Sequence, residues 1–347
     1  MIISYGNDFT SGREYGLSFF RQNISVDMGS STVLVSLEGK GIVLESPSLV
    51  AVKEGTTDIQ AIGEDALYLM GRTPEEITTV RPVANGIISN YTMAAAMLRY
   101  FINKAVQNPL KKILKPDVII TIPCQTTNVE KRAVEQAALE AGARRVYLIY
   151  SPLAAAIGAG IDINKPYGNL VIDIGGGSTD IAVISYGGIV TSRSVKVGGN
   201  VFDETIKNYL KKNSALLIGD KSAELIKREV ASLSHGVRNE SMLVRGSDII
   251  TGLPNEKEIR TEEIVDSLIE AAMPILNGLY SVMGETPPEL SADIYTQGVV
   301  LTGGGALISG IDELIKKSTG IDVTIAEDPV GCAVTGASVI LEREKSK

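Results

Sequence analysis

The sequence predicts an α/β fold made of two duplicated halves, and three observations lead to this. Two segments about one domain apart repeat one pattern, in which an apolar run ends on an acid, a tight glycine turn follows and a second apolar run begins. Strand-like apolar runs alternate with helical stripes along the chain, as in α/β domains. At 347 residues the chain exceeds one comfortable core, and length alone suggests roughly two domains.

Each copy of the repeat is typical of a phosphate-binding turn. The copies span Ile24–Val35, with Asp27 before the turn, and Val171–Val183, with Asp173 before the turn. Small residues let the backbone approach an anion, so backbone N–H groups can hold phosphate oxygens, while the hydroxyls add donors and the aspartates suit a hydrated Mg²⁺. The duplication predicts a nucleotide between the two halves. The predicted phosphate turns are Gly29, Ser30, Ser31 and Thr32, and Gly175, Gly176, Gly177, Ser178 and Thr179.

Two strand–turn–helix junctions and one helical pair also bear on a nucleotide. Bare glycine backbone at such a junction lets a flat base or a phosphate lie close. Glu224 and Lys227 are three residues apart on a predicted helix, so they either grip the adenosine ribose or base edge or form an exposed intrahelical ion pair. The junctions contain Gly198, Gly199 and Asn200, and Gly303, Gly304, Gly305 and Ala306.

The other elements follow from apolar periodicity and from helix end signals. Residues 118–123 and 146–149 read as strands, and a short helix begins at Pro152. Between the strands, a helix that ends near Gly142 has three candidate caps, Thr126, Thr127 and Asn128. Two further helices carry apolar stripes that predict core-facing sides rather than cofactor contacts. The stripes are Met93, Met97, Phe101 and Ala105, and Ile264, Leu268, Ala272, Ile275 and Leu279.

Composition narrows the function classes. The net charge of −8 provides no global basic field for nucleic acid. The two cysteines, Cys124 and Cys332, lack CxxC spacing, which indicates a reducing interior with buried thiols and argues against thiolate metal ligation. The single histidine, His235, lies in a polar stretch that we interpret as a surface loop, so a Ser-His-Asp triad has no support.

The sequence contains no apolar run of the roughly 20 residues that a membrane span needs. Residues 1–23 lack a basic start followed by an apolar core, so they do not resemble a signal peptide. Their aromatic content leaves two interpretations open: an amphipathic anchor for a membrane or partner, or a partly disordered or cloning-derived extension. The aromatic residues are Tyr5, Phe9, Tyr15, Phe19 and Phe20.

The order of these motifs resembles the superfamily of actin, Hsp70 and the sugar kinases, in which ATP lies between two duplicated domains. More closely, the chain resembles MreB, the bacterial actin family, from about Ile24 to about Leu341. An Hsp70 would need a long C-terminal substrate domain. The runs that carry the resemblance are Lys40–Ser48, Gly71–Pro74, Arg81–Ile88, Glu130–Ala133, Ala154–Gly160, Pro287–Leu290 and Leu301–Gly305.

The resemblance implies an actin-like fold of two RNase H-like domains around a nucleotide cleft, each with a small outer subdomain. It implies binding of ATP or ADP with Mg²⁺, weak ATPase activity and paired filaments that govern cell shape. The expected location is the cytoplasm, at the anionic inner face of the cell membrane, with paralogues and membrane-bound morphogenesis proteins as partners. The implied domains are 24–163 with 334–347 (small lobe about 46–82) and 164–333 (small lobe about 199–261), after the 1–23 extension.

The resemblance also assigns roles to single residues. The turns match the phosphate loops, and Asp27 and Asp173 match the acids that hold the metal and its waters. The nucleoside grip is matched by Gly304, Gly305, Glu224 and Lys227. Five positions depart from the family pattern. Ser151 replaces the glutamate taken to activate the attacking water, and Ser178 replaces a threonine but keeps its hydroxyl beside the water. Asp180 shortens another glutamate, Thr32 replaces Asn and Asn200 replaces Asp.

Because serine accepts no proton at neutral pH, and a general base contributes roughly 10²–10⁴-fold in rate, Ser151 predicts slow ATP hydrolysis. The candidate catalytic positions are therefore Ser151, Asp173, Ser178 and Asp180. The alternatives are a filament with a specialised role such as motility, a small-molecule kinase that binds a sugar or acid, and an Hsp70-type ATPase that responds to a client.

A lysine-flanked apolar pair between two prolines aligns with the membrane-inserting loop of some MreB proteins. The other interpretation is an ordinary helix-to-strand loop with two partly buried residues. The candidate membrane residues are Lys111, Lys112, Ile113, Leu114 and Lys115.

Overall fold

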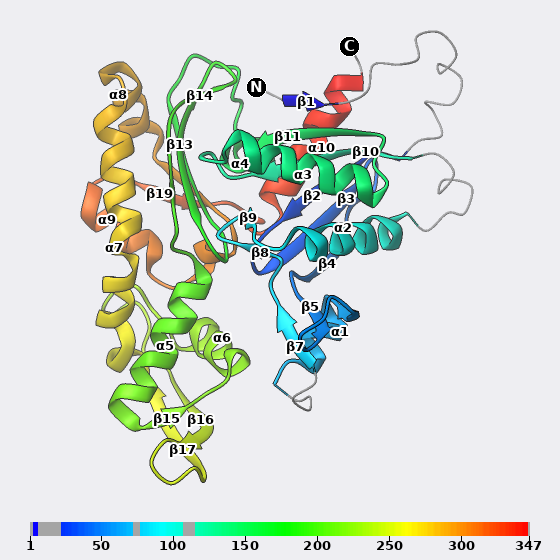
Figure 1. The fold of residues 1–347 in the computed structure, drawn as a ribbon. Coiled ribbons are helices and arrows are strands. Elements are labelled where there is room, and N and C mark those ends of the chain that lie inside the picture. The colour runs from blue at the N-terminus through cyan, green and yellow to red at the C-terminus, as the bar shows by residue number, and fades with distance from the viewer. Residues whose placement is uncertain (1–2, 6–21, 72–76, 107–114, 346–347) are drawn as a thin grey trace. The chain divides into compact units, whose positions relative to one another are not determined.

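The computed structural model describes residues 3–5, 22–71, 77–106 and 115–345. The chain divides into two compact units (Figure 1). Unit 1 comprises Met1–Pro166, Ser185–Ile189 and Val330–Lys347, and unit 2 comprises Tyr167–Ile184 and Val190–Pro329. No helix in the described part of the chain is long and apolar enough to cross a membrane.

Unit 1 is built on a six-stranded sheet in the order β1-β11-β10-β2-β3-β4. The hairpin of β2 and β3 is antiparallel, and β10 runs parallel to both β2 and β11. β1 pairs antiparallel with β11 at the edge of the sheet, a strand that the sequence analysis did not predict within residues 1–23. The strands are β1 (Ile3–Tyr5), β2 (Ile24–Met28), β3 (Thr32–Leu37), β4 (Gly41–Pro47), β10 (Asp117–Ile122) and β11 (Arg145–Tyr150).

Four helices pack on this sheet. α2 (Tyr91–Ala105) and α3 (Asn128–Ala141) lie side by side (Figure 1). Thr127 caps α3 in a capping box with Glu130, and the αL residue Gly142 ends it, which confirms the predicted helix. The predicted apolar stripe of α2 is buried. α4 (Ser151–Gly158) packs against the C-terminal helix α10 (Cys332–Lys345), which also contacts β2 and β10.

Two glycines set how closely α4 and α10 approach. An added Cβ on Gly158 would lie 1.9 Å from the carbonyl oxygen of Cys332, and one on Gly336 would lie 1.8 Å from that of Ala154. Side-chain carbons do not tolerate such distances, so this contact between the helix backbones requires glycine at both positions.

The remainder of unit 1 consists of smaller elements. A three-stranded antiparallel sheet in the order β6-β5-β7 lies with α1 inside the predicted small lobe 46–82. The hairpin of β8 and β9 turns at Asn85 and Gly86, both with positive φ, as two-residue hairpin turns require. These elements are β5 (Val50–Lys53), β6 (Ile59–Ile62), α1 (Glu64–Leu69), β7 (Ile77–Val80), β8 (Val83–Ala84) and β9 (Ile87–Ile88).

Unit 2 has a five-stranded sheet in the order β14-β13-β12-β18-β19 and a small sheet in the order β15-β16-β17. The small sheet lies within the predicted lobe 199–261. The strands are β12 (Asn169–Ile174), β13 (Thr179–Ser185), β14 (Gly188–Val195), β15 (Leu216–Leu217), β16 (Ser241–Asp248), β17 (Pro254–Arg260), β18 (Val299–Thr302) and β19 (Val323–Ile325). The helices are α5 (Gly199–Ser214), α6 (Asp220–Glu229), α7 (Thr261–Glu285), α8 (Pro288–Gln297), α9 (Ile311–Thr319) and the 3₁₀ turn η2 (Gly304–Leu307).

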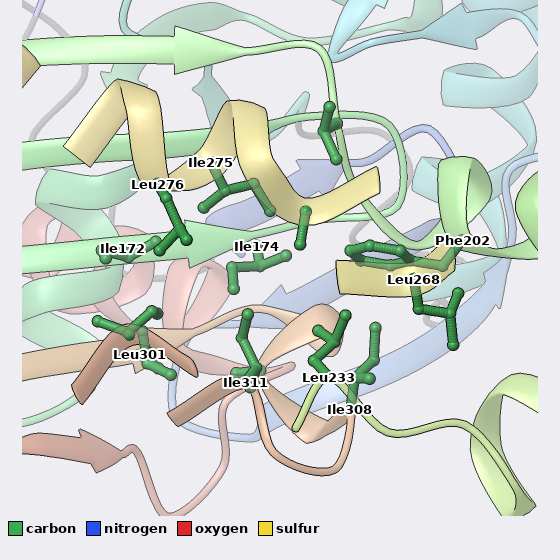
Figure 2. Packing of buried hydrophobic residues seen from close by; sticks show 14 of the residues in the cluster. Ile172, Ile174, Phe202, Leu233, Leu268, Ile275, Leu276, Leu301, Ile308 and Ile311 are labelled. Carbon is green, nitrogen blue, oxygen red and sulfur yellow. The ribbon is translucent and has the colours of Figure 1, made fainter. Parts of the chain in front are cut away.

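The core of unit 2 forms where the long helix α7 covers the sheet (Figure 2). Leu268, Ile275 and Leu276 of α7 belong to one buried cluster with Ile172 and Ile174 of β12. Because β12 is buried on both sides, its end is held rigidly, and that end carries Asp173 and the second glycine turn.

One sequence expectation about the thiols is wrong. Cys332 is buried in α10, but Cys124 is partly exposed, since it lies in the connection between β10 and α3 rather than inside either element. The His235 side chain is exposed in a loop of unit 2, as predicted, and lies 2.9 Å from Asp266 Oδ1.

Candidate functional site

The first predicted phosphate turn joins β2 to β3. The amide of Gly29 donates to the carbonyl oxygen of Thr32 at 3.0 Å and closes the turn. A Cβ on Gly29 would lie 2.7 Å from the same oxygen, so the tight turn depends on glycine. The strand–acid–turn–strand pattern predicted for residues 24–35 is confirmed.

Ser30 is buried and ties the first turn to the β8–β9 hairpin. Its hydroxyl accepts a hydrogen bond from the amide of Gly86 at 2.9 Å, and its carbonyl oxygen accepts one from Arg81 Nη1 at 3.2 Å. The neighbouring carbonyl of Ser31 accepts from the amide of Ser48 at 2.9 Å. The turn is thus braced from two directions, and the Ser30 hydroxyl keeps its own proton to donate.

Asp27 lies at the end of β2, two residues before the turn. The hydroxyl of Thr121 on β10 donates to Asp27 Oδ1 at 2.5 Å. Burial raises the pKa of the Asp27 carboxyl above its ordinary value, and the hydrogen bond from Thr121 opposes that rise. A carboxylate that burial makes costly to ionise is suited to a cation, which would compensate the charge.

The second turn in unit 2 repeats the first. The amide of Gly175 donates to the carbonyl oxygen of Ser178 at 2.8 Å, and Asp173 again lies two residues before the turn. Asp180 on β13 is paired in register with Asp173 and is buried. The hydroxyl of Thr179 donates to the carbonyl of Val197 at 2.7 Å, so this side chain braces the turn from within.

The N-terminus of α5 holds the second turn from the other side. The amide of Gly199 donates to the carbonyl of Gly175 at 3.0 Å, and the amide of Asn200 donates to that of Gly176 at 2.8 Å. Gly198 lies so close that an added Cβ would be 2.4 Å from the Gly175 carbonyl oxygen. Both phosphate-turn carbonyls are therefore fixed, and the predicted 198–200 junction meets the predicted 175–179 turn.

The glycine junction after β18 also meets this turn. Gly303 has φ 79° and ψ 161°. A Cβ there would lie 2.4 Å from the Ile174 carbonyl oxygen and 2.6 Å from Asp173 Oδ1. The preceding Thr302 is fully buried, and its hydroxyl has no hydrogen-bond partner. Gly304 is exposed, whereas Gly305 and Ala306 are buried and pack against β12.

The helical pair on α6 does not form the intrahelical ion pair that was one of the two interpretations of its spacing. Glu224 pairs with Arg228 at 2.7 Å rather than with Lys227. Lys227 Nζ lies 2.7 Å from Asp203 Oδ2 and donates to the carbonyl of Gly199 at 3.2 Å. Each of the two residues therefore has its own partner, and the sequence analysis gave no role to Asp203, the partner of Lys227.

Ser151 is the first residue of α4 and is buried in unit 1. The preceding Tyr150 accepts a hydrogen bond from Lys131 Nζ at 3.0 Å, and the same ammonium lies 5.2 Å from the centre of the ring. Among the candidate membrane residues, Lys115 is exposed, and residues 111–114 lie outside the described part of the chain.

The residues fit a nucleotide with a hydrated cation, each unit taken separately. Glycine at both turns and at 303 lets the backbone fold tightly where a Cβ would press on neighbouring protein atoms, and the acids before the turns could supply oxygen ligands. No group of three or more His, Cys, Asp or Glu residues within the described ranges is arranged to hold a metal. Mg²⁺ needs none, since it keeps several waters and takes few protein carboxylates.

Some of these contacts could not be found from local sequence. Gly86 is 56 residues from Ser30, and Thr121 is 94 residues from Asp27. The Asn85-Gly86 dipeptide is a recognisable hairpin-turn signal in the sequence, but it does not indicate that Ser30 is the partner of Gly86.

Comparison with known proteins places this geometry in a family. A sequence profile of the MreB/Mbl protein family matches residues 21–347. The cell shape-determining protein Mbl of Bacillus cereus is 45% identical over 324 residues, which cover 93% of this chain and 96% of that protein. MreB of Escherichia coli is 40% identical, over 93% of this chain and 94% of that protein.

Solved structures agree. The crystal structure of MreB5 of Spiroplasma citri bound to AMPPNP is 36% identical and has a TM-score of 0.89, with 94% of this chain and 97% of that chain covered. A MamK double helical filament is 21% identical with a TM-score of 0.78, which supports the actin-like fold alone. With its duplicated turns, its actin-like fold and these relatives, the chain belongs to the MreB/Mbl family.

Proposed function

We propose that this protein binds ATP or ADP with Mg²⁺ and assembles into filaments that determine cell shape. The observation that carries the proposal is the turn that occurs in both units. In each copy, the glycine two residues after an aspartate donates its amide to the carbonyl oxygen of the residue three positions later. The similarity to an MreB bound to AMPPNP, and to one bound to ADP, supports nucleotide binding. The Mbl and MreB relatives support the cell-shape role.

Different residues of the chain then bind different parts of the nucleotide and its cation. Backbone amides of the two turns bind phosphate oxygens, and the Ser30 hydroxyl donates its proton to one of them while it accepts from Gly86. Asp27 and Asp173 would hold the cation through its waters, and the bound cation would neutralise phosphate charge. The glycines of 303–305 give the nucleoside a flat surface.

Assembly is the first test. Purified protein is sedimented over a concentration series with ATP, ADP or AMPPNP. We expect a sharp critical concentration with ATP and AMPPNP. ATP binding without assembly under any of the three nucleotides would refute the filament and favour an ATPase that does not polymerise.

We also propose that ATP hydrolysis is slow, because Ser151 cannot act as a general base at the start of α4. Ser151→Glu should raise the rate of phosphate release by about 10²-fold or more if the glutamate acts as base. Ser151→Gln is the matched control, since it has nearly the same size without the base. A Glu variant that binds ATP but is no faster than the Gln variant would contradict this account.

Membrane association is proposed from the sequence of residues 111–115. Each inserted apolar side chain would contribute about 1.5–3 kcal/mol, and each lysine about 1 kcal/mol on an anionic leaflet, so a filament would bind by avidity. Co-sedimentation with phosphatidylglycerol-containing vesicles should fall for the Ile113→Ser, Leu114→Ser double variant. Undiminished binding would remove this segment from the proposal.

A further inference from the structure

A buried ion pair between Lys227 of α6 and Asp203 of α5 is connected to the second phosphate turn by one residue, Gly199. The side chains of Lys227 and Asp203 are only 14% and 17% exposed, and their Nζ–Oδ2 distance is 2.7 Å. The other hydrogen bond of the ammonium goes to the carbonyl of Gly199, at 3.2 Å. Both contacts of Lys227 are therefore made to α5, a helix that begins at Gly199.

Gly199 lies between this ion pair and the turn. Its amide donates to the carbonyl of Gly175 at 3.0 Å, while its carbonyl accepts from Lys227. A Cβ on Gly199 would lie 3.2 Å from Lys227 Nζ on one side and 3.8 Å from the Gly176 Cα on the other. Among the described residues no side chain caps the start of α5, and the amides of Gly199 and Asn200 donate instead to carbonyls of the turn.

We propose that Lys227 and Asp203 form a strut that fixes the second phosphate turn through Gly199, and that both are positioning residues for the phosphates of the nucleotide. This rests on the proposed nucleotide binding and gives Lys227 a second role, setting the phosphate turn, beside the nucleoside contact that the family resemblance implies. It adds Asp203, which has no role in the motif interpretation of the sequence.

The charges explain why the two residues depend on each other. Within the part of the chain that the structure describes, Asp203 Oδ1 is buried without a hydrogen-bond partner, and the Lys227 ammonium is the ion-pair partner that compensates the charge of the carboxylate. Burial raises the pKa of Asp203, Lys227 opposes this, and the nearby Glu224 and Asp220 add to the rise. Loss of Lys227 would leave a poorly solvated carboxylate beside the start of α5, and loss of Asp203 would release the ammonium from Gly199.

The test compares Lys227→Met, Asp203→Asn and the double variant with a matched control, Arg228→Met. Arg228 is the next residue on α6 and forms an exposed pair with Glu224. Affinities for ATP, ADP and AMP are measured by isothermal titration calorimetry in Mg²⁺. A strut predicts that each single variant loses on the order of 10-fold in ATP affinity, with a smaller loss for ADP, and that Asp203→Asn loses little affinity for AMP. The double variant should lose no more than the larger single loss.

A nucleoside grip predicts another pattern. Lys227→Met would weaken ATP, ADP and AMP by the same factor while Asp203→Asn left all three unchanged, and this result would overturn the strut.

A second measurement needs no nucleotide. Hydrogen exchange of the Gly199 and Asn200 amides in nucleotide-free protein should be faster in Lys227→Met and Asp203→Asn than in wild type and Arg228→Met. Unchanged exchange would overturn the strut even where nucleotide binding is normal. A wild type that binds no ATP would refute the proposed function, while the exchange data would still decide whether the strut holds the turn.

Discussion

Replacement of Gly303 by alanine tests how the nucleotide-facing backbone is held. The residue has φ 79° and ψ 161°, a region that is essentially restricted to glycine and costs other residues about 1–3 kcal/mol. The new Cβ would also lie 2.4 Å from the Ile174 carbonyl oxygen and 2.6 Å from Asp173 Oδ1. Overpacking of this kind costs about 1–3 kcal/mol, so we expect a total loss of about 2–6 kcal/mol in the free energy of unfolding.

Gly320→Ala separates the two contributions. Gly320 ends α9 in the same unit with φ 73° and ψ 5°, and no atom lies within 4 Å of its added Cβ. Its substitution should cost only the left-handed strain, about 1–2 kcal/mol. The chain has no tryptophan, so urea unfolding is followed by far-ultraviolet circular dichroism rather than by tryptophan fluorescence.

The comparison decides whether the crowding at Asp173 is real. Gly303→Ala should shift the urea midpoint clearly further than Gly320→Ala, and ATP should restore less of the lost stability because Asp173 is displaced. Equal midpoints for the two variants would refute the inference that β18 and the second turn approach so closely that only glycine fits.

Three other changes have definite expectations. Asp27→Asn should raise the Tm of the nucleotide-free protein at pH 7 and remove the stabilisation by Mg²⁺ and ATP. Because burial raises the pKa of Asp27, the stability that this carboxyl contributes is complete below its ordinary pKa of 3.8 and is lost as the pH rises through the raised pKa. The difference in Tm between Asp27→Asn and wild type should therefore shrink towards pH 4, and equal Tm values at pH 7 would contradict this prediction. Gly336→Ala should cost about 1–3 kcal/mol or more by forcing α10 from the Ala154 carbonyl, whereas Gly284→Ala, whose Cβ meets open space, should not lower the Tm. Thr127→Ala should lower the free energy of unfolding by about 1 kcal/mol because the α3 cap is lost. Thr127→Ser, which keeps the capping hydroxyl, should retain most of that stability in the same thermal melts.

Local signals predicted the parts of this molecule that local physics determines. The turns at Gly29 and Gly175 close within four residues, so the acid-glycine pattern was enough to place them. The cap at Thr127 and the end of α3 at Gly142 likewise depend on neighbours in sequence. The family resemblance supplied the actin-like fold.

The parts that sequence analysis missed depend on tertiary partners. Spacing on α6 suggested that Glu224 and Lys227 act together, but the fold brings Asp203 to Lys227 from 24 residues away and leaves Glu224 with Arg228. The pairing of β1 with β11 joins residues whose separation in sequence exceeds one hundred, and three-residue strands carry almost no periodicity. Such contacts are selected by the assembled sheet rather than by the segments that make them.

The chain path implies an order of events during synthesis. Unit 2 is almost continuous in sequence, but unit 1 is completed only by α10, which packs on α4 through Gly158 and Gly336 and on the strands that carry Asp27 and Thr121. Domains generally fold as units while the ribosome extends the chain. Unit 2 is therefore able to fold before α10 emerges, whereas unit 1 keeps apolar surface uncovered until α10 packs on α4.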